Sequence, residues 1–166
     1  MSSTLEIIRN KIVDTTALLL RANVWRFQSR KIVFTNGCFD LLHLGHIDYL
    51  ARAADEGDVL IVGVNSDSSA RKLKGPHRPI NHQEQRSMLL AALHFTSAIV
   101  LFDEDTPLEL ITLLKPDVLI KGSDYKIDEI VGADAVRSNG GKVKTIDFLE
   151  GYSTTMMEDR IRSGRG

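Results

Sequence analysis

The segment that decides the fold covers residues 34–46, which read Phe34-Thr35-Asn36-Gly37-Cys38-Phe39-Asp40-Leu41-Leu42-His43-Leu44-Gly45-His46. An apolar stretch leads into this segment, a glycine-containing turn follows, and a helix is predicted to begin close to Gly45. In a doubly wound parallel sheet, ligands bind beyond the carboxyl ends of the strands, where the strand order reverses. Free backbone amides in such a turn, and the positive end of the next helix dipole, suit a phosphate group. The segment therefore predicts a local anion site.

Two imidazoles in this segment suit the same anion. His43 and His46 are three residues apart at the start of the helix, so both can converge on one phosphate, and Gly45 has no side chain to hinder its approach. Either histidine alone could be a structural residue. A metal site is another alternative, but no third His, Cys or carboxylate stands at a ligand spacing. The segment also lacks the Walker A and G-x-G-x-x-G patterns.

Five apolar stretches rich in Val and Ile alternate with helical segments along the chain. They are Lys31–Thr35, Val59–Val64, Ala98–Phe102, Val118–Lys121 and Val143–Ile146. This alternation is typical of βαβ units. It predicts one α/β domain with a doubly wound, parallel, five-stranded, Rossmann-like sheet and helices on both faces.

Helix start and stop signals lie between these stretches. Thr106-Pro107-Leu108-Glu109 predicts a capped helix start. Asn81, three residues before a glutamate, predicts the cap of a helix that runs to about His94. Gly57 and the pair Gly140-Gly141 are typical of helix C-terminal stops.

Residues 1–30 are predicted to form a helical extension that precedes a domain at residues 31–162. A serine and a glutamate at capping-box spacing open the extension, and Leu5, Ile8 and Ile12 would share one face of its first helix. No residue type suited to catalysis stands out there. We therefore expect this segment to pack on the sheet edge or on a second subunit.

Composition limits the class of protein. The 166 residues include 21 Lys and Arg and 22 Asp and Glu, a formal net charge of −1, so no global basic field attracts nucleic acid or an anionic membrane. Apolar runs are far shorter than the roughly 20 residues of a membrane-spanning helix, and the N-terminus lacks the layout of a secretion signal. We expect a cytoplasmic protein without nucleic-acid or membrane partners.

Cys38 is the single cysteine, which excludes an intrachain disulfide and a multi-cysteine metal cage. It could serve as a nucleophile, but no histidine-plus-carboxylate arrangement accompanies it in the sequence. We expect a small buried side chain at the turn.

Two motifs resemble the signatures of a known superfamily. The segment from Gly37 to His46 resembles the G-x-F-D-x-x-H-x-G-H signature of the nucleotidyltransferases that include the cytidylyltransferases. Gly151-Tyr152-Ser153-Thr154-Thr155 resembles the second signature, a G-x-S-T-[ST] turn before the last helix. The resemblance covers residues from about 31 to 162 and implies the H-x-G-H nucleotidyltransferase fold.

Further stretches are similar to the adenylyltransferase domains of bacterial ADP-heptose synthesis, which occur alone or fused to a sugar kinase. These stretches are Val64–Asp67, Leu73–Gly75, Arg78-Pro79, Glu84–Arg86, Glu104–Pro107 and Lys121–Tyr125. The resemblance implies transfer of AMP from ATP to a sugar 1-phosphate, D-glycero-β-D-manno-heptose 1-phosphate. The products would be ADP-heptose, used in lipopolysaccharide core biosynthesis, and pyrophosphate.

Three alternatives to this activity remain open. Two are a cytidylyltransferase acting on glycerol 3-phosphate or a similar alcohol phosphate, and an FAD-forming adenylyltransferase. The third is a nucleotide-binding module without catalysis. Phe148 and the acidic run Asp103-Glu104-Asp105 stand where glycerol-phosphate cytidylyltransferases carry an arginine and a lysine, and both departures weaken the first alternative.

The resemblance implies roles for individual residues. His43 and His46 match the catalytic pair that donates hydrogen bonds to phosphate oxygens as negative charge develops. In the basic loop between Arg71 and Arg78, Lys72 or Lys74 is the candidate for bridging the phosphates of the two substrates. The expected nucleotide-binding residues are Cys38, Phe39, Gly45, Arg86, Lys121, Asp124, Tyr125, Ser153, Thr154 and Thr155.

Some of these assignments have structural alternatives. Arg86 could be an exposed helix arginine, and Asp124 and Tyr125 could serve a tight turn. Mg²⁺ is expected to be held mainly by the triphosphate and water, as this hard ion commonly is, so no protein metal ligand is predicted. A homodimer is expected, because dimers are the commonest soluble assembly and relatives of this kind are often dimeric.

Overall fold

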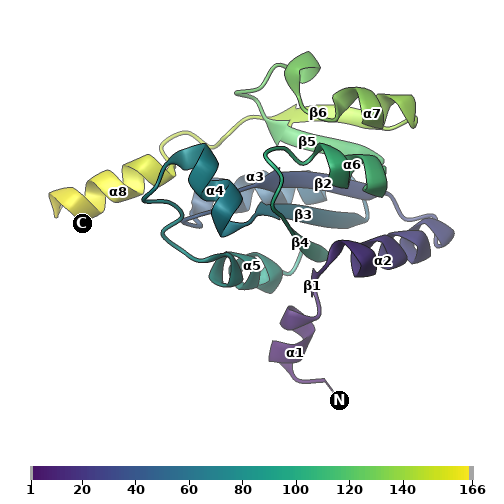
Figure 1. Cartoon of the computed structure of the whole chain (residues 1–166), viewed down its shortest axis with the longest axis horizontal. Coiled ribbons are helices and arrows are strands. Elements are labelled where there is room, and N and C mark those ends of the chain that lie inside the picture. The colour runs from purple at the N-terminus through teal and green to yellow at the C-terminus, as the bar shows by residue number, and fades with distance from the viewer. Residues whose placement is uncertain (1, 165–166) are drawn as a thin grey trace.

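A six-stranded parallel sheet forms the centre of the computed structural model, which describes residues 2–164 (Figure 1). The strands are β1 (Ile12–Val13), β2 (Ile32–Gly37), β3 (Val59–Asn65), β4 (Ala98–Phe102), β5 (Val118–Gly122) and β6 (Lys142–Ile146). Their spatial order is β1-β4-β3-β2-β5-β6. The chain adds β3 and β4 on one side of β2 and then β5 and β6 on the other, so the order reverses between β2 and β5. The predicted doubly wound sheet is confirmed.

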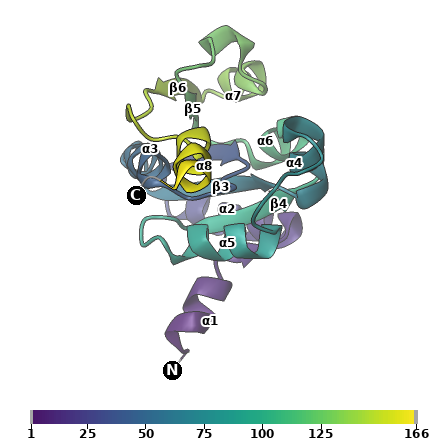
Figure 2. The same cartoon turned by 90° about the vertical axis from the view of Figure 1, so that its left-hand side faces the viewer.

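Helices cover both faces of the sheet. They are α1 (Thr4–Arg9), α2 (Thr15–Phe27), α3 (Leu44–Ala54), α4 (Asp67–Lys74), α5 (Gln83–Ala92), α6 (Leu108–Leu114), α7 (Ala133–Ser138) and α8 (Thr154–Ser163), with a short 3₁₀ helix at Ile127–Glu129. Buried side chains of α2, α6 and α7 pack on one face, and those of α3 and α5 pack on the other. Figure 2 shows α1 projecting from the rest. Within residues 2–164, no helix is both long enough and apolar enough to span a bilayer.

The two cores explain why the strands are recognisable in the sequence. Along β2, Ile32 and Phe34 point into the core under α2 and α6, whereas Val33 points into the core under α3. Successive side chains of a strand alternate between faces. Because both faces are covered, nearly every strand position is apolar, and each strand reads as a continuous Val/Ile-rich run.

The sixth strand corrects the prediction of five. Helical periodicity places Ile12 on the face of the first helix, but that helix ends at Arg9, and Ile12 and Val13 form β1 beside β4. Ile12 lies opposite Ile99 in the parallel register. The N-terminal segment therefore contributes a strand to the sheet as well as helices.

Helix caps agree with the sequence in part. The capping box at the start of α1 is present. Helix α6 begins after Pro107 rather than Thr106, and α5 begins after His82 rather than Asn81; neither start has a side-chain cap. Asn81 instead donates from Nδ2 to the carbonyl of Asp40 at 2.9 Å. The Asn81 side chain therefore makes a long-range contact with Asp40 and does not cap the helix that the local pattern predicts.

Candidate active site

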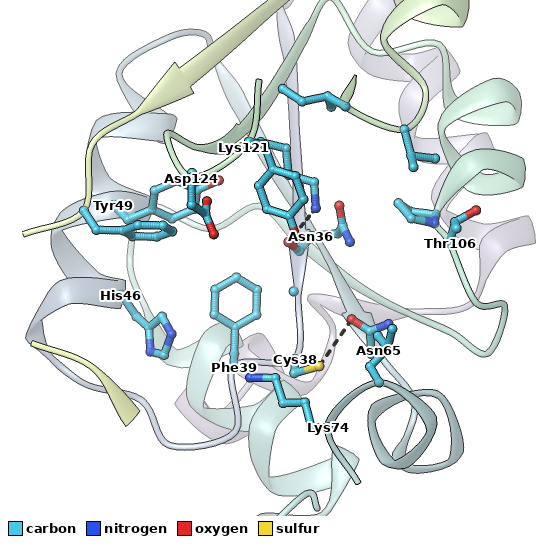
Figure 3. A pocket seen from close by; sticks show the side chains of 18 of the residues that line it. Asn36, Cys38, Phe39, His46, Tyr49, Asn65, Lys74, Thr106, Lys121 and Asp124 are labelled. Atoms are coloured by element: carbon cyan, nitrogen blue, oxygen red, sulfur yellow. Dashed lines mark hydrogen bonds between the residues drawn. The ribbon is translucent and has the colours of Figure 1, made fainter. Parts of the chain in front are cut away.

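A cavity of about 520 Å³ opens at the carboxyl ends of the central strands, where the strand order reverses (Figure 3). Asn36 at the end of β2, Asn65 at the end of β3 and Lys121 near the end of β5 contribute to its wall. Figure 3 shows His46 at one end of the cavity and Thr106 at the other. The cavity therefore lies where a doubly wound sheet is expected to bind its ligand.

His43 is both a helix cap and a candidate catalytic residue. It is the N-cap of α3, and its Nδ1 accepts a hydrogen bond from the backbone N–H of His46 at 3.4 Å. An imidazole nitrogen that accepts carries no proton, so the proton of neutral His43 is placed on Nε2. The cap thus leaves Nε2 as the hydrogen-bond donor of this ring.

The two imidazole rings are stacked. Their centroids are 3.7 Å apart at an interplanar angle of 20°, and the Phe39 ring meets His46 edge-on. Burial lowers the pKa of His46 to about 4, and the nearby charges of His43 and Lys74 act in the same direction. Burial also lowers the pKa of His43. Both rings are therefore neutral at pH 7 and suit hydrogen-bond donation better than ion pairing.

The turn before α3 is held by Asp40. Phe39 has a φ of +47°, and the Asp40 carboxylate, which is 1% exposed, accepts from the backbone N–H groups of Ile80 and Asn81 and from the guanidinium of Arg78. Burial opposes the charged form, but these hydrogen bonds outweigh it and hold the pKa of Asp40 below its usual value. The turn that carries the first motif is thereby tied to residues 78–81.

The second motif lies against the first. Ser153 is the N-cap of α8, and its Oγ accepts from the N–H of Met156 at 3.2 Å. A Cβ atom placed on Gly45 would lie 3.2 Å from Cβ of Tyr152 and 3.1 Å from the ring of His43. Any larger residue at position 45 would press on both neighbours, so glycine allows the two motifs to approach each other closely.

The two candidate bridging lysines differ in position. Lys74, the last residue of α4, lines the cavity. Lys72 is 63% exposed and does not line the cavity, although it pairs at 3.4 Å with Asp105, which does. Of the two lysines, Lys74 alone lies in the cavity wall.

Lys121 is a buried amine at the end of β5. Its Nζ donates to the carbonyl of Asn36 at 3.4 Å and lies 5.5 Å from the ring centroid of Tyr125. Burial lowers the pKa of Lys121 to about 8, and the negative charge of Asp124 opposes that shift. An amine with this pKa carries a proton on most molecules at pH 7.

Arg86 does not reach the cavity. Its fully buried guanidinium donates to the carbonyl of Cys38 at 2.6 Å, to Oδ1 of Asp67 at 2.8 Å and to the carbonyl of Asn81 at 2.9 Å. These acceptors lie in the turn of the first motif, in the loop before α5 and at the first residue of α4. The sequence suggested either a phosphate contact or an exposed position on a helix for Arg86. The structure shows neither, because the buried guanidinium joins segments of the chain to one another.

The predicted site residues fall into two spatial groups besides Arg86. Those in the cavity wall are Cys38, Phe39, His46, Lys74, Lys121, Asp124 and Tyr125. Those outside the wall are His43, Gly45, Lys72, Ser153, Thr154 and Thr155. Apart from Lys72, this second group belongs to the two motifs that meet at Gly45.

The cavity wall also contains residues that the sequence did not single out. The Tyr49 hydroxyl pairs with Oγ1 of Thr35 at 2.8 Å, and its ring centroid lies 5.5 Å from that of Phe148. Burial raises the pKa of Tyr49 to about 12. Tyr49 follows His46 by three residues, so a search for polar side chains on the same helix face would have found it.

Cys38 lies in the cavity wall as a buried thiol. Its Sγ is 3.7 Å from Oδ1 of Asn65, to which the thiol donates, and burial raises the pKa of the thiol. A neutral buried thiol fits the predicted small turn residue. Within residues 2–164, no group of three or more His, Cys, Asp and Glu side chains is arranged to hold a metal ion.

Neutral donors at the reversal point of a parallel sheet suit an anion that gains charge during a reaction. Helix starts suit phosphate groups, and the turn before α8 lies against the first motif. The class of protein that this fold and site define is the nucleotidyltransferases of the H-x-G-H type.

The chain belongs to the cytidylyltransferase-like family, whose family model matches residues 34–160. It is 49% identical over 154 residues to the bifunctional protein HldE of Methylobacillus flagellatus, covering 93% of this chain and 32% of that protein. It is 58% identical over 133 residues to the bifunctional protein HldE of Campylobacter jejuni subsp. jejuni serotype O:6, covering 80% and 28%. The chain thus spans about a third of the length of these relatives.

Solved structures agree with this family. The crystal structure of the lipopolysaccharide core biosynthesis protein from Thermoplasma volcanium GSS1 superimposes with a TM-score of 0.61 and 32% sequence identity, covering 75% of this chain and 99% of that one. The pantoate-beta-alanine ligase from Francisella tularensis shares the fold at a TM-score of 0.57 and 16% identity, covering 89% of this chain and 75% of that one.

Proposed function

We propose that this chain transfers AMP from ATP to D-glycero-β-D-manno-heptose 1-phosphate, giving ADP-heptose and pyrophosphate. The observation that carries the reaction class is the neutral, half-buried His46 in the wall of the cavity, directly after Gly45, where the two motifs approach each other. The choice of acceptor is supported by the relatives, which include HldE proteins and a lipopolysaccharide core biosynthesis protein.

The reaction needs positioning and charge stabilisation rather than a protein nucleophile. An oxygen of the acceptor phosphate attacks the α-phosphorus of ATP, a new P–O bond forms, and the bond to the bridging oxygen breaks. Pyrophosphate leaves with the electron pair of that bond. We assign to His46 and His43 the donation of hydrogen bonds to the phosphate oxygens on which charge develops.

We infer that the two substrates occupy different sides of the cavity. The H-x-G-H turn follows β2, and the second motif follows β6, so ATP is placed over the β2, β5 and β6 side of the cavity. Lys121, Asp124 and Tyr125 then face the nucleotide. The remaining wall, which includes Asn65 and Thr106, lies at the β3 and β4 side and is left for the sugar phosphate.

Lys74 is proposed to bridge the two substrates. Two phosphates that approach each other repel, and a lysine in the wall between their sites offsets that repulsion. Lys74 lines the cavity, whereas Lys72 lies outside the wall and is already paired with Asp105 at its edge. We therefore assign the bridging role to Lys74.

Three further assignments complete the proposal. Mg²⁺ arrives with ATP and is held mainly by the triphosphate and water, and it neutralises phosphate charge when bound. The reaction takes place in the cytoplasm, where ATP is available. The chain acts as a homodimer, which sedimentation at micromolar concentration would test; a monomer at every concentration would contradict this assignment.

Pyrophosphate release tests the proposed function. The protein is incubated with ATP or CTP and with a panel of acceptors that includes the heptose 1-phosphate, glycerol 3-phosphate and FMN. We expect the highest kcat/KM for ATP with the heptose 1-phosphate. A preference for CTP with glycerol 3-phosphate would show a cytidylyltransferase instead of the proposed enzyme. A preference for ATP with FMN would show an FAD-forming adenylyltransferase.

Two histidine variants, one in the cavity wall and one outside it, distinguish a catalyst from a protein that only binds nucleotide. We expect His46→Ala to lower turnover at least 10²-fold, as removal of one charge-stabilising donor commonly does. His94→Ala removes an exposed histidine outside the cavity wall and should leave turnover unchanged. If wild type binds nucleotide but releases no pyrophosphate with any acceptor, the chain is a binding module.

A further inference from the structure

Arg78 joins the two motifs through a pair of carboxylates. Its Nη1 donates to Oδ2 of Asp40 at 3.0 Å, and its Nη2 donates to Glu158 in α8. The side chain of Arg78 is 21% exposed and that of Glu158 is 14% exposed. Ion pairs that are largely removed from water are screened less than surface pairs. We call this three-residue contact the Arg78 bridge.

The Asp40 end of the bridge is fixed. Besides Arg78, the Asp40 carboxylate accepts from the N–H groups of Ile80 and Asn81 at 2.8 and 2.9 Å. The Asn81 side chain donates back to the Asp40 carbonyl. The backbone that carries Arg78 is therefore held against the turn of the first motif. This contact fixes the position from which the Arg78 side chain reaches toward α8.

The α8 end of the bridge has few other constraints. Helix α8 contains no buried residue, and Figure 1 shows it extending away from the sheet. The partly covered residues at its start are Ser153, Thr154, Met157 and Glu158. Glu158 follows Thr154 by four residues, so the two lie on one face of the helix. A helix with so little apolar contact depends on polar contacts for its position.

We propose that Arg78 is a positioning residue that sets the start of α8 against the H-x-G-H turn, so that both motifs reach the same triphosphate. Arg78 acts through Glu158 and needs no contact with substrate. Displacement of Glu158 moves Ser153 and Thr154 with it, because they belong to the same helix start. This inference rests on the proposed function, since it takes the start of α8 to bind ATP phosphates.

Glu158→Gln tests the bridge with almost no change in side-chain volume. We expect KM for ATP to rise about tenfold, as for loss of one partly buried charge pair. The kcat and the KM for the sugar phosphate should stay within about twofold of wild type, because the imidazole pair and the acceptor side of the cavity are unchanged. Arg78→Lys keeps the charge but has no planar fork to span two carboxylates, so its KM for ATP should lie between those of wild type and Glu158→Gln.

Arg162→Gln is the matched control. Arg162 also faces Glu158, at 3.9 Å, but it is 77% exposed and does not connect α8 to the first motif. We expect this variant to keep the wild-type KM for ATP. An equal rise of KM in Arg162→Gln and Glu158→Gln would overturn the bridge, because any loss of charge on α8 would then suffice.

Hydrogen exchange in nucleotide-free protein provides a readout that does not depend on catalysis. Backbone amides at the start of α8 should exchange faster in Glu158→Gln than in wild type and Arg162→Gln. Unchanged exchange together with unchanged KM for ATP would overturn the inference. So would a loss of thermal stability and kcat with unchanged KM. If wild type released no pyrophosphate, the proposed function would fail, while exchange and ATP affinity by calorimetry would still test the bridge.

Discussion

His46 shows how burial and chemistry coincide in one side chain. An imidazole whose pKa is lowered to about 4 is neutral at pH 7, and a neutral ring is easier to bury than a charged one. A buried neutral donor is already free of water when negative charge develops on a phosphate. Burial of the ring therefore prepares it for the role that we propose.

Replacement of His46 by Asn should reduce the loss of stability on acidification between pH 6.5 and pH 4. The folded pKa of about 4 lies below the ordinary value of 6.5, so the unfolded chain binds the proton first and the free energy of unfolding falls as pH drops through this window. The effect is roughly 2 to 3 kcal/mol. Urea unfolding at pH 7 and pH 4.5 measures it. Asp40, whose pKa is lowered, loses its contribution only below the ordinary carboxylate range. An equal pH effect in both proteins would contradict the assignment.

Burial of the charged Lys121 amine lowers the stability of the fold, while its positive charge suits the binding of ATP phosphates. Because burial lowers its folded pKa from 10.5 to about 8, wild-type stability should rise between pH 8 and pH 10.5, where the unfolded chain holds the proton longer. Lys121→Met should remove that rise and increase the free energy of unfolding at pH 7 by roughly 1 to 3 kcal/mol. KM for ATP should increase severalfold. Chemical unfolding and pyrophosphate release measure the two effects, with the exposed Lys142→Met as control. A destabilised Lys121→Met protein would refute this account.

Among the elements, the start of helix α3 meets the turn before α8 at Gly45. Alanine favours a helix interior over glycine by about 1 kcal/mol, but its Cβ would press on the His43 ring at 3.1 Å and on Tyr152 at 3.2 Å. We expect Gly45→Ala to change the free energy of unfolding by less than about 1 kcal/mol and to lower kcat/KM for ATP about tenfold. Thermal unfolding and pyrophosphate release test this pair of results. An unchanged kcat/KM for ATP in Gly45→Ala would contradict the expectation, because it would show that catalysis does not depend on the close approach of the two motifs.

The strands of the central sheet were predictable because burial on both faces gives long apolar runs. Strand β1 was not, since two residues show no alternation and Ile12 also fits the helical spacing from Ile8. The caps at Thr106 and Asn81 failed for a different reason. Cap patterns describe local competition for backbone N–H groups, and the contact of Asn81 with Asp40 is made across the fold.

Site residues were predictable where the chain keeps them together. The turn from Cys38 to His46 and the start of α8 are contiguous motifs. Arg86 and Arg78 could not be placed from the sequence, because their acceptors lie up to 48 and 80 residues away along the chain. Phe148 was noticed only as a departure from other families, and its contact with Tyr49 depends on the packing of α3 beside β6.

At the scale of the whole molecule, the sequence places a boundary between an extension at residues 1–30 and a domain at residues 31–162. If that boundary separates independent units, a chain that starts at residue 31 should fold alone. We expect them not to fold cooperatively, because Leu18 and Ala22 of α2 are fully buried against the sheet and β1 pairs with β4 along its outer edge. Removal of α2 uncovers apolar core, and removal of β1 leaves an open strand edge.

Circular dichroism on heating and light scattering compare the chain starting at residue 31 with the full chain. A deletion of residues 2–9 is the control, since α1 contains no buried residue. A cooperative transition at the full-length temperature in the shorter chain would support the division and contradict our expectation.

The reversal of strand order between β2 and β5 has a consequence for how such proteins diversify. Loops after β3 and β4 reach one end of the cavity, whereas loops after β5 and β6 reach the other. Substitutions in one set of loops can therefore alter preference for one reactant and leave recognition of the other intact. An ancestral scaffold could acquire new acceptors by drift at one rim while its central imidazoles stayed untouched.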